Sequence, residues 1–414
     1  MFRLDPGSRR AALPFALAAL VVLGALVPGA ALAEDAGAED EAGAEIEDGA
    51  TVVETAVPME GPELPVWKRR WPEPLRLGPL PGRTKNPLYL QHLQPSPRRA
   101  RVLDEGQLEL GFQVDWSNLY DTWKRIVPNG RQISDLDMEI VRTAFSGRFG
   151  LPFGIELGVE VPLLSYVGGL SDPWIQAWHG VLNAENGGRE DDRDRDFAYE
   201  VLMPGQVHVD YPSTRLGLGD ITTELHVQIL RPGGPIPGVS ARFLVKLPTG
   251  DEDKGLGSGA GDVGALLNLE HGWRRLALFG HVGALVRGRT GPLGSILTSV
   301  GVTYATTFEL GLTRHWSLVV GIQGSSRFHS GFVHRFMKWS PMGLTAGTRV
   351  RIGDFDFGFG MEQDVLNGDP SSDVALVFDA SFRVGGRANR LRELSTEASE
   401  TKESRRPIQN PVIP

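Results

Sequence analysis

Twelve charged residues are the first candidates for chemistry in this chain, because each occupies the polar position of a segment in which polar and apolar residues alternate. Six are acids and six are bases: Glu109, Glu156, Glu160, Glu224, Glu270, Glu362, Arg242, Lys246, Arg287, Arg349, Arg351 and Arg383. Charged side chains of both signs can bind ions and sort small polar solutes. We predict that these residues line one lumen, whose charges either pair and close it or border a narrow channel.

Residue types that serve catalysis or metal binding are present without the spacing that either needs. The nine histidines are scattered and form no zinc-binding pair, and the absence of cysteine excludes thiolate metal sites and disulfides. His329 and Ser330 invite comparison with lipid hydrolases of barrel rims, but neighbours on a strand point to opposite faces. Residues 189–196 hold five acids among three arginines, without the spacing of a calcium loop. We expect no catalytic residue, no metal ion and no cofactor.

The alternation has the two-residue period of a β-strand with one polar and one apolar face. Val374, Leu376, Phe378, Ala380 and Phe382, for example, alternate with mostly polar or small neighbours. An even number of strands, each long enough to cross a bilayer at a tilt, is typical of a transmembrane barrel. The sequence predicts twelve antiparallel strands, at residues 107–117, 136–148, 152–166, 216–230, 238–247, 261–271, 275–287, 295–311, 316–326, 339–352, 354–363 and 373–385.

The predicted connections alternate between short turns and longer loops, which is the outer-membrane pattern. The connection after the first predicted strand is one of the longer ones, and that after the third has about 50 residues. Aromatic residues near strand ends, such as Trp116, Tyr166 and Trp273, fit the interfacial girdles of such barrels. In this arrangement the apolar faces meet lipid. The alternative is a soluble β-sandwich in which they point inward.

The N-terminal region predicts export. Arg9 and Arg10 precede the apolar residues 11–27, and Ala31 to Ala33 form a small-residue cleavage motif, so residues 1–33 are interpreted as a signal peptide cleaved after Ala33. An uncleaved membrane anchor is the alternative. Residues 34–60 carry ten acids and no Lys or Arg, and are expected to be a disordered linker.

The region that follows, 61–105, holds nine prolines, which disfavour helix and strand. Its apolar residues suggest that it packs on something, either in the periplasm or as a plug in the lumen, and a plain linker is the alternative. We assign residues 106–385 to the barrel and 386–414 to a polar C-terminal tail.

The long loop after the third strand contains a predicted amphipathic helix over residues 172–183. Asp172 and Pro173 suit its first positions, and Trp174, Ile175 and Trp178 share one face. We expect these three residues to constrict the lumen, with a helix lying on the rim as the alternative.

Several short motifs resemble one known family. They are Asn86-Pro87-Leu88, Gly168-Gly169-Leu170, Trp178-His179-Gly180, Asn186-Gly187-Gly188-Arg189 with Asp191, Leu216-Gly217-Leu218-Gly219-Asp220, Lys246-Leu247-Pro248-Thr249-Gly250, Gly257-Ser258-Gly259 with Asp262, and Pro370-Ser371-Ser372-Asp373. Over residues 80–385 the chain resembles the bacterial family catalogued as domain of unknown function 3187. The resemblance implies an exported outer-membrane barrel and supplies neither an activity nor a catalytic residue.

Together these patterns predict an outer-membrane β-barrel of a Gram-negative bacterium, and not an enzyme. A narrow channel for small polar solutes is the expected function. The alternatives are a non-conducting barrel that binds through its outer loops, a soluble secreted sandwich and, least favoured, a lipid hydrolase at the rim. Expected partners are outer-membrane lipid, the barrel-assembly machinery and small polar solutes. The formal charge of −9 argues against nucleic acid.

Overall fold

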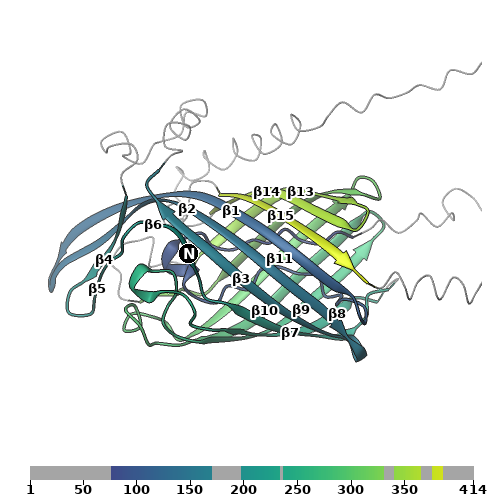
Figure 1. Ribbon diagram of the computed structural model, residues 1–414, viewed down its shortest axis with the longest axis horizontal. Helices are drawn as coiled ribbons and strands as arrows, with labels where there is room; N and C mark the ends of the chain where they lie inside the picture. Colours follow the sequence, from purple (N-terminus) through teal and green to yellow (C-terminus); the bar gives the residue numbers. More distant parts are fainter. Residues whose placement is uncertain (1–75, 170–196, 234–235, 331–339, 365–374, 386–414) are drawn as a thin grey trace, which may run out of the picture.

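The computed structural model describes residues 76–169, 197–233, 236–330, 340–364 and 375–385. Twelve antiparallel strands form a closed barrel in which β1 pairs with β15 and thereby joins the two ends of the sheet (Figure 1). They are β1 (Leu108–Val127), β2 (Gly130–Leu151), β3 (Ile155–Val167), β7 (Thr222–Leu230), β8 (Gly238–Lys246), β9 (Asp262–Trp273), β10 (Leu276–Arg287), β11 (Val300–Gly311), β12 (Trp316–Ser325), β13 (Met342–Ile352), β14 (Phe355–Asp364) and β15 (Ala375–Val384).

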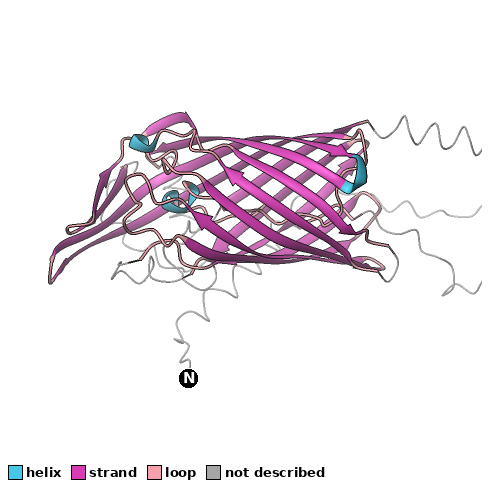
Figure 2. Cartoon of the chain, turned by 90° about the horizontal axis from the view of Figure 1, so that it is seen from below, coloured by secondary structure: helices cyan, strands magenta, loops and turns pink. Residues whose placement is uncertain are grey.

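Three shorter strands and three short helices complete the described elements (Figure 2). The strands are β4 (Ala198–Met203), β5 (Val207–Asp210) and β6 (Thr214–Leu218), and the helices are α2 (Pro87–Leu90), η1 (Pro152–Gly154) and η3 (Glu252–Lys254). No helix in the described part of the chain is long and apolar enough to cross a membrane.

The barrel wall is polar inside and apolar outside. Along β9, Leu267 and Leu269 are 44% and 50% exposed, whereas the intervening Asn268 and the following Glu270 are completely buried. The same inversion runs along β11, where every second residue is exposed and Phe308 reaches 59%. A sandwich would bury its apolar faces between two sheets, so the soluble-sandwich alternative is wrong.

The two rims differ as the sequence predicted. We call the end that holds η1 and the turns after β9, β11 and β13 the short rim, and the opposite end the long rim. The first strand also begins and the last strand ends at the short rim, because Leu108 is paired with Val384. Both ends of the barrel wall therefore lie on the same side.

The prediction of a longer loop after the first strand is wrong. Strands β1 and β2 instead continue as a paired hairpin far beyond the barrel, joined only by residues 128–129 (Figure 1). Gly130 has φ 134°, so the turn at Pro128-Asn129-Gly130 needs a glycine there. The alternation in this extension serves a core outside the barrel, with Leu119, Leu136 and Met138 each at most 1% exposed.

That core lies at the long rim, and we call it the outer core. It combines the extended hairpin, the β4–β5 hairpin and the loops that follow η3, β10 and β12. Tyr166, predicted to belong to an interfacial girdle, is instead completely buried there, edge-on to Tyr199 at 5.6 Å between ring centroids. Burial raises the pKa of Tyr199 well above its ordinary value, so its hydroxyl stays neutral.

Other strand boundaries also differ from the predictions. The fourth predicted strand, 216–230, is two strands, β6 and β7, which both pair with β3 and are separated by residues 219–221. The eighth begins at Val300 rather than at residue 295. The β4–β5 hairpin lies in the predicted long loop and was missed, because its strands have only six and four residues.

The outward apolar face predicts that an arginine placed there impairs assembly. Val282, in the middle of β10, is 55% exposed, and Val282→Arg should cost about 2–4 kcal/mol at the midplane of a bilayer. Ile126 is 85% exposed on the extended hairpin, outside the barrel, so Ile126→Arg is the matched control and should change stability by at most about 0.5 kcal/mol. The folded fraction is measured as the fast-migrating band of unboiled SDS gels. Equal assembly of the two variants would contradict the prediction.

Candidate functional site

The lumen of the barrel is occupied by the chain that precedes it. Residues 76–103, which we call the lumen segment, enter at the short rim, where the amide of Leu77 donates to Glu309 Oε1 at 2.9 Å. Residues 76–86 form an ascending leg towards the long rim, and residues 91–103 a descending leg that returns. The descending leg reaches the short rim again where the amide of Leu103 donates to Glu156 Oε2 at 2.9 Å. The segment therefore crosses the lumen twice before it joins β1.

The turn between the two legs is helix α2, and its sequence explains it. The Asn86 side chain accepts a hydrogen bond from the amide of Leu88 at 2.9 Å, and Pro87 fills the first helical position. Leu88 and Tyr89 are buried in the outer core, where Tyr89 stacks on Phe328 with ring centroids 4.5 Å apart. The motif Asn86-Pro87-Leu88 thus holds the far end of the lumen segment.

Inward glycines make room for the ascending leg. A Cβ atom at Gly347, Gly358 or Gly360 would lie 2.6–2.7 Å from the methyl carbons of Leu80, so glycine at these positions of β13 and β14 leaves room for that side chain. At the short rim, a Cβ atom at Gly272 would lie 1.9 Å from the guanidinium of Arg76. The wall is shaped for this segment.

Charged residues contribute many of the contacts that hold the two legs, beside apolar contacts such as that of Leu93 with Leu266. The lumen segment carries six Lys and Arg residues and no acid. Four of the six pair with carboxylates of the wall, namely Arg83, Lys85, Arg98 and Arg99. Lys85 Nζ lies 3.2 Å from Asp115 Oδ1 and 3.5 Å from Glu362 Oε2. Arg99 Nη2 lies 2.6 Å from Glu270 Oε1.

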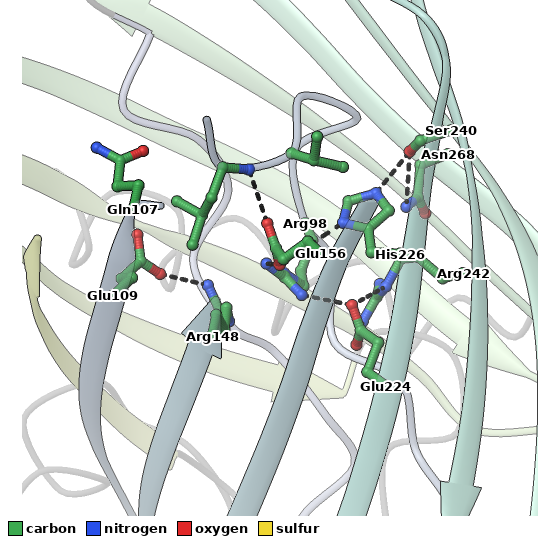
Figure 3. A network of polar contacts seen from close by, with 12 residues as sticks. Arg98, Gln107, Glu109, Arg148, Glu156, Glu224, His226, Ser240, Arg242 and Asn268 are labelled. Carbon is green, nitrogen blue, oxygen red and sulfur yellow. Dashed lines mark hydrogen bonds and ion pairs between the residues drawn. The ribbon is translucent and has the colours of Figure 1, made fainter. Parts of the chain in front are cut away.

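Arg98 makes the most complete of these contacts (Figure 3). Its guanidinium bridges Glu156, at 2.7 Å from Oε1, and Glu224. Arg242 holds the second oxygen of Glu224 at 2.7 Å, and His226 Nδ1 lies 3.8 Å from Glu156. Glu156, Glu224 and His226 are close enough to hold a metal ion, but the guanidinium of Arg98 already supplies the positive charge that their carboxylates need.

Other wall carboxylates pair with cations of the wall itself. Glu109 accepts from Arg148 at 2.6 Å and from Arg383 at 2.7 Å. Arg349 Nη2 lies 2.6 Å from Asp379 Oδ2, and its Nη1 donates to the carbonyl of Pro79 in the lumen segment. Two kinds of ion pair therefore coexist in the lumen, one within the wall and one between the wall and the segment.

The twelve predicted lining residues all lie on the inward face. Besides those above, Glu160 pairs with Arg83 and Arg142, Lys246 with Asp220, and Arg351 with Asp356. Arg287 differs, because its guanidinium carbon lies 3.8 Å over the Phe328 ring. In the described part of the wall, seven further inward charges are not among the predicted lining residues: Asp115, Asp262, Glu309, Asp356, Asp379, Arg142 and Arg148. Period-two alternation could have found Asp115, which follows Glu109 by six residues.

Three motifs behind the family resemblance meet at one point of the long rim. Lys246 Nζ donates to Ser258 Oγ at 2.7 Å and to the carbonyl of Ala260 at 2.9 Å, and it pairs with Asp220. Asp220 also accepts from the amide of Gly250 at 2.9 Å. A lysine beside a serine can resemble a nucleophile and its base. Here the Lys246 ammonium is paired with the Asp220 carboxylate, so the cluster is interpreted as structural.

Small spaces lie beside the lumen segment in the described part of the barrel. Cavities of ≈ 70 and ≈ 130 Å³ lie between the segment and the wall, the first next to Arg83 and Arg142 and the second next to Arg99 and Arg349. Each cavity is large enough to hold water. The lumen segment therefore occupies much of the lumen that the structure describes.

Some predicted features lie outside the described residues. They include the constricting residues Trp174, Ile175 and Trp178, the signal peptide and the acidic linker. His329 and Ser330 are described, and their side chains take different partners. Ser330 Oγ donates to the carbonyl of Ile296 at 3.1 Å, whereas the His329 ring stacks on Tyr89.

Comparisons with known proteins give a family and several solved structures of limited similarity. Residues 66–384 match the family model described as "Protein of unknown function (DUF3187)". A search of curated protein sequences gives no match. Among solved structures, an outer membrane channel from Pseudomonas putida F1 is similar with a TM-score of 0.46 and 11% identity, over 71% of this chain and 100% of that one. The NanC porin is similar with a TM-score of 0.40 and 9% identity, over 66% and 100%.

The contacts of Arg98 predict that its removal loosens the descending leg. Arg98→Ala leaves the buried Glu156 without its cation, and breaking a buried pair costs about 3–5 kcal/mol. Arg101→Ala is the matched control, because Arg101 is 46% exposed and its pair with Asp104 is worth at most about 1 kcal/mol. Amide hydrogen exchange of residues 98–103 should rise much more in the first variant. Similar exchange in both would show that Arg98 does not hold the leg.

Proposed function

The chain belongs to the DUF3187 family, and we propose that it is an outer-membrane channel whose lumen is closed, in this conformation, by the lumen segment. The observation that carries the proposal is the nature of the interface between segment and wall. Many of its contacts are ion pairs and hydrogen bonds, such as Lys85 with Asp115 and Arg98 with Glu156. Leu93 of the segment also packs in a small apolar cluster with wall leucines such as Leu266. Water can replace such contacts, whereas an apolar interface would be costly to expose.

The wall supports a location in the outer membrane. Every barrel strand pairs with two neighbours, so the backbone groups of the closed sheet are satisfied without water. Apolar residues such as Phe308 and Leu269 point outward. The export signal predicted over residues 1–33 and its cleavage after Ala33 are part of this proposal.

The size of the wall supports transport rather than a filled barrel. Eight strands enclose a space that side chains fill, and twelve enclose more. Here the excess space holds two extended legs of chain, so removing them would leave a continuous polar passage. The proposal assigns the lumen residues to solute passage and not to catalysis.

The outer core supports an alternative of binding without conduction. The extended β1–β2 hairpin and the β4–β5 hairpin project beyond the long rim, as a surface-binding protein would require. Ion conductance distinguishes the two functions, because a channel conducts and a binding barrel does not.

Deletion of residues 76–103 tests the channel directly. If the lumen segment closes the pore, the deletion variant should show a conductance in planar bilayers well above that of the intact chain, because the wall alone does not fill its lumen. The fast-migrating band of unboiled SDS gels shows that the variant has folded. A folded variant that does not conduct would contradict the channel and favour the binding barrel.

A disulfide provides the complementary test in the full chain, which contains no native cysteine. A Cβ atom at Gly82 would lie 2.7 Å from the Gln323 side-chain carbonyl carbon, so Gly82→Cys with Gln323→Cys can link the ascending leg to β12. The oxidised protein should stay closed and the reduced protein should open, so each preparation serves as its own control. Gly82→Cys alone controls for the loss of glycine. Openings that persist unchanged on oxidation would show that the ascending leg need not move.

A further inference from the structure

We propose that the lumen wall binds cationic solutes, of the guanidinium or ammonium class, and that the lumen segment is an internal competitor for the same carboxylates. The inference rests on the channel proposed above and names the class of solute that this channel would admit. Its basis is the way in which charge is divided between segment and wall.

Four inward carboxylates of the described wall have no Lys or Arg partner from the wall itself. Among the described residues, none of the wall's Lys or Arg forms an ion pair with Glu156, Glu270, Glu309 or Glu362. Glu156 and Glu270 pair with Arg98 and Arg99, and Glu362 pairs with Lys85, all from the lumen segment. Glu309 accepts from the segment amides of Leu77 and Gly78 at 2.9 and 3.0 Å.

The four carboxylates do not lack wall partners because the wall has few cations, since other inward carboxylates are paired with arginines of the wall. Glu109 has two of them, Arg148 and Arg383, and Asp379 has Arg349. When the segment moves away, these wall pairs remain, whereas the four carboxylates lose the cations or amides that the segment gave them. Glu362 keeps only the neutral Gln323, and Glu156 keeps His226. The vacated lumen is therefore acidic at both of its ends, with Glu362 towards the long rim and Glu156, Glu270 and Glu309 towards the short rim.

The positions that the Arg98 and Lys85 side chains occupy have the geometry of cation-binding sites. At the descending leg, a planar guanidinium fits between Glu156 and Glu224, with His226 beside it (Figure 3). At the ascending leg, an ammonium lies between Asp115 and Glu362. A solute that presents either group can repeat the contacts of the segment, whereas an anion would meet carboxylates that have lost their partners.

The first test measures selectivity in the full chain. The open channel should prefer K⁺ to Cl⁻ by about fivefold or more, because uncompensated carboxylates in a narrow passage attract cations. Replacing the four carboxylates by glutamine (E156Q/E270Q/E309Q/E362Q) should bring the ratio near one and also raise the open fraction, because the segment loses its partners. Asp210 and Asp253 are exposed beyond the lumen, so D210N/D253N is the matched control and should keep the selectivity.

The second test does not depend on conduction. Arginine amide should compete with the segment and speed amide hydrogen exchange of residues 98–103 in the intact chain, by about tenfold at ten times its dissociation constant. Citrulline amide has nearly the same shape without the charge, so it should have little effect, as should NaCl at equal ionic strength. The four-glutamine variant should lose the response to arginine amide.

The outcomes separate the two proposals. A conducting channel without cation preference, or equal effects of arginine amide and citrulline amide, would overturn the inference and leave the channel intact. A protein that never conducts but responds to arginine amide would overturn the channel and keep the cation site.

Discussion

The space enclosed by twelve strands governs the rest of this structure. A wall of this size cannot be filled by its own side chains, and an empty lumen would be an open pore. The chain closes it with residues 76–103, which cross the lumen as two extended legs. The prolines of this segment suit that role, because a chain surrounded by side chains of a finished wall has no neighbouring strand to receive its amides. Its amides turn instead to carboxylates such as Glu309 and Glu362.

The division of ion pairs has a thermodynamic consequence. A buried ion pair gains little net stability, because desolvation offsets most of its attraction, but removing one partner is costly. Pairs between segment and wall therefore select one docked position without adding much stability to it. When water enters in place of the segment, both sides are solvated again and the cost of separation falls. Polar docking is thus compatible with release in a way that a leucine-rich interface would not be.

The sequence could predict the wall because the wall obeys local rules. Period-two alternation identifies the strands, and the same alternation places residues such as Glu109 and Arg349 inside. The lumen segment obeys no period. Its contacts join Leu77 to Glu309 and Arg98 to Glu156, across separations that only the closed barrel brings together. The inward glycines near Leu80 were a usable signal, since a polar face rich in glycine leaves room for another chain.

Errors at the long rim have a different physical origin. The alternation of β1 and β2 continues past the barrel, but its apolar side there meets the outer core and not lipid. Pattern alone cannot distinguish the two apolar surroundings, so the sequence predicts a loop over residues 118–135.

The distinction between outer core and lipid matters for the lumen segment. Its turn is held by apolar burial of Leu88 and Tyr89 in the outer core. Its legs are held by apolar contacts such as that of Leu93 and also by ion pairs, which salt and competing cations weaken. Loosening the legs does not by itself free the turn, and a change in the outer core does not by itself release the legs. In the proposed channel, the two ends of the segment would therefore respond to different stimuli, and full opening would require changes both in the outer core and in the lumen ion pairs.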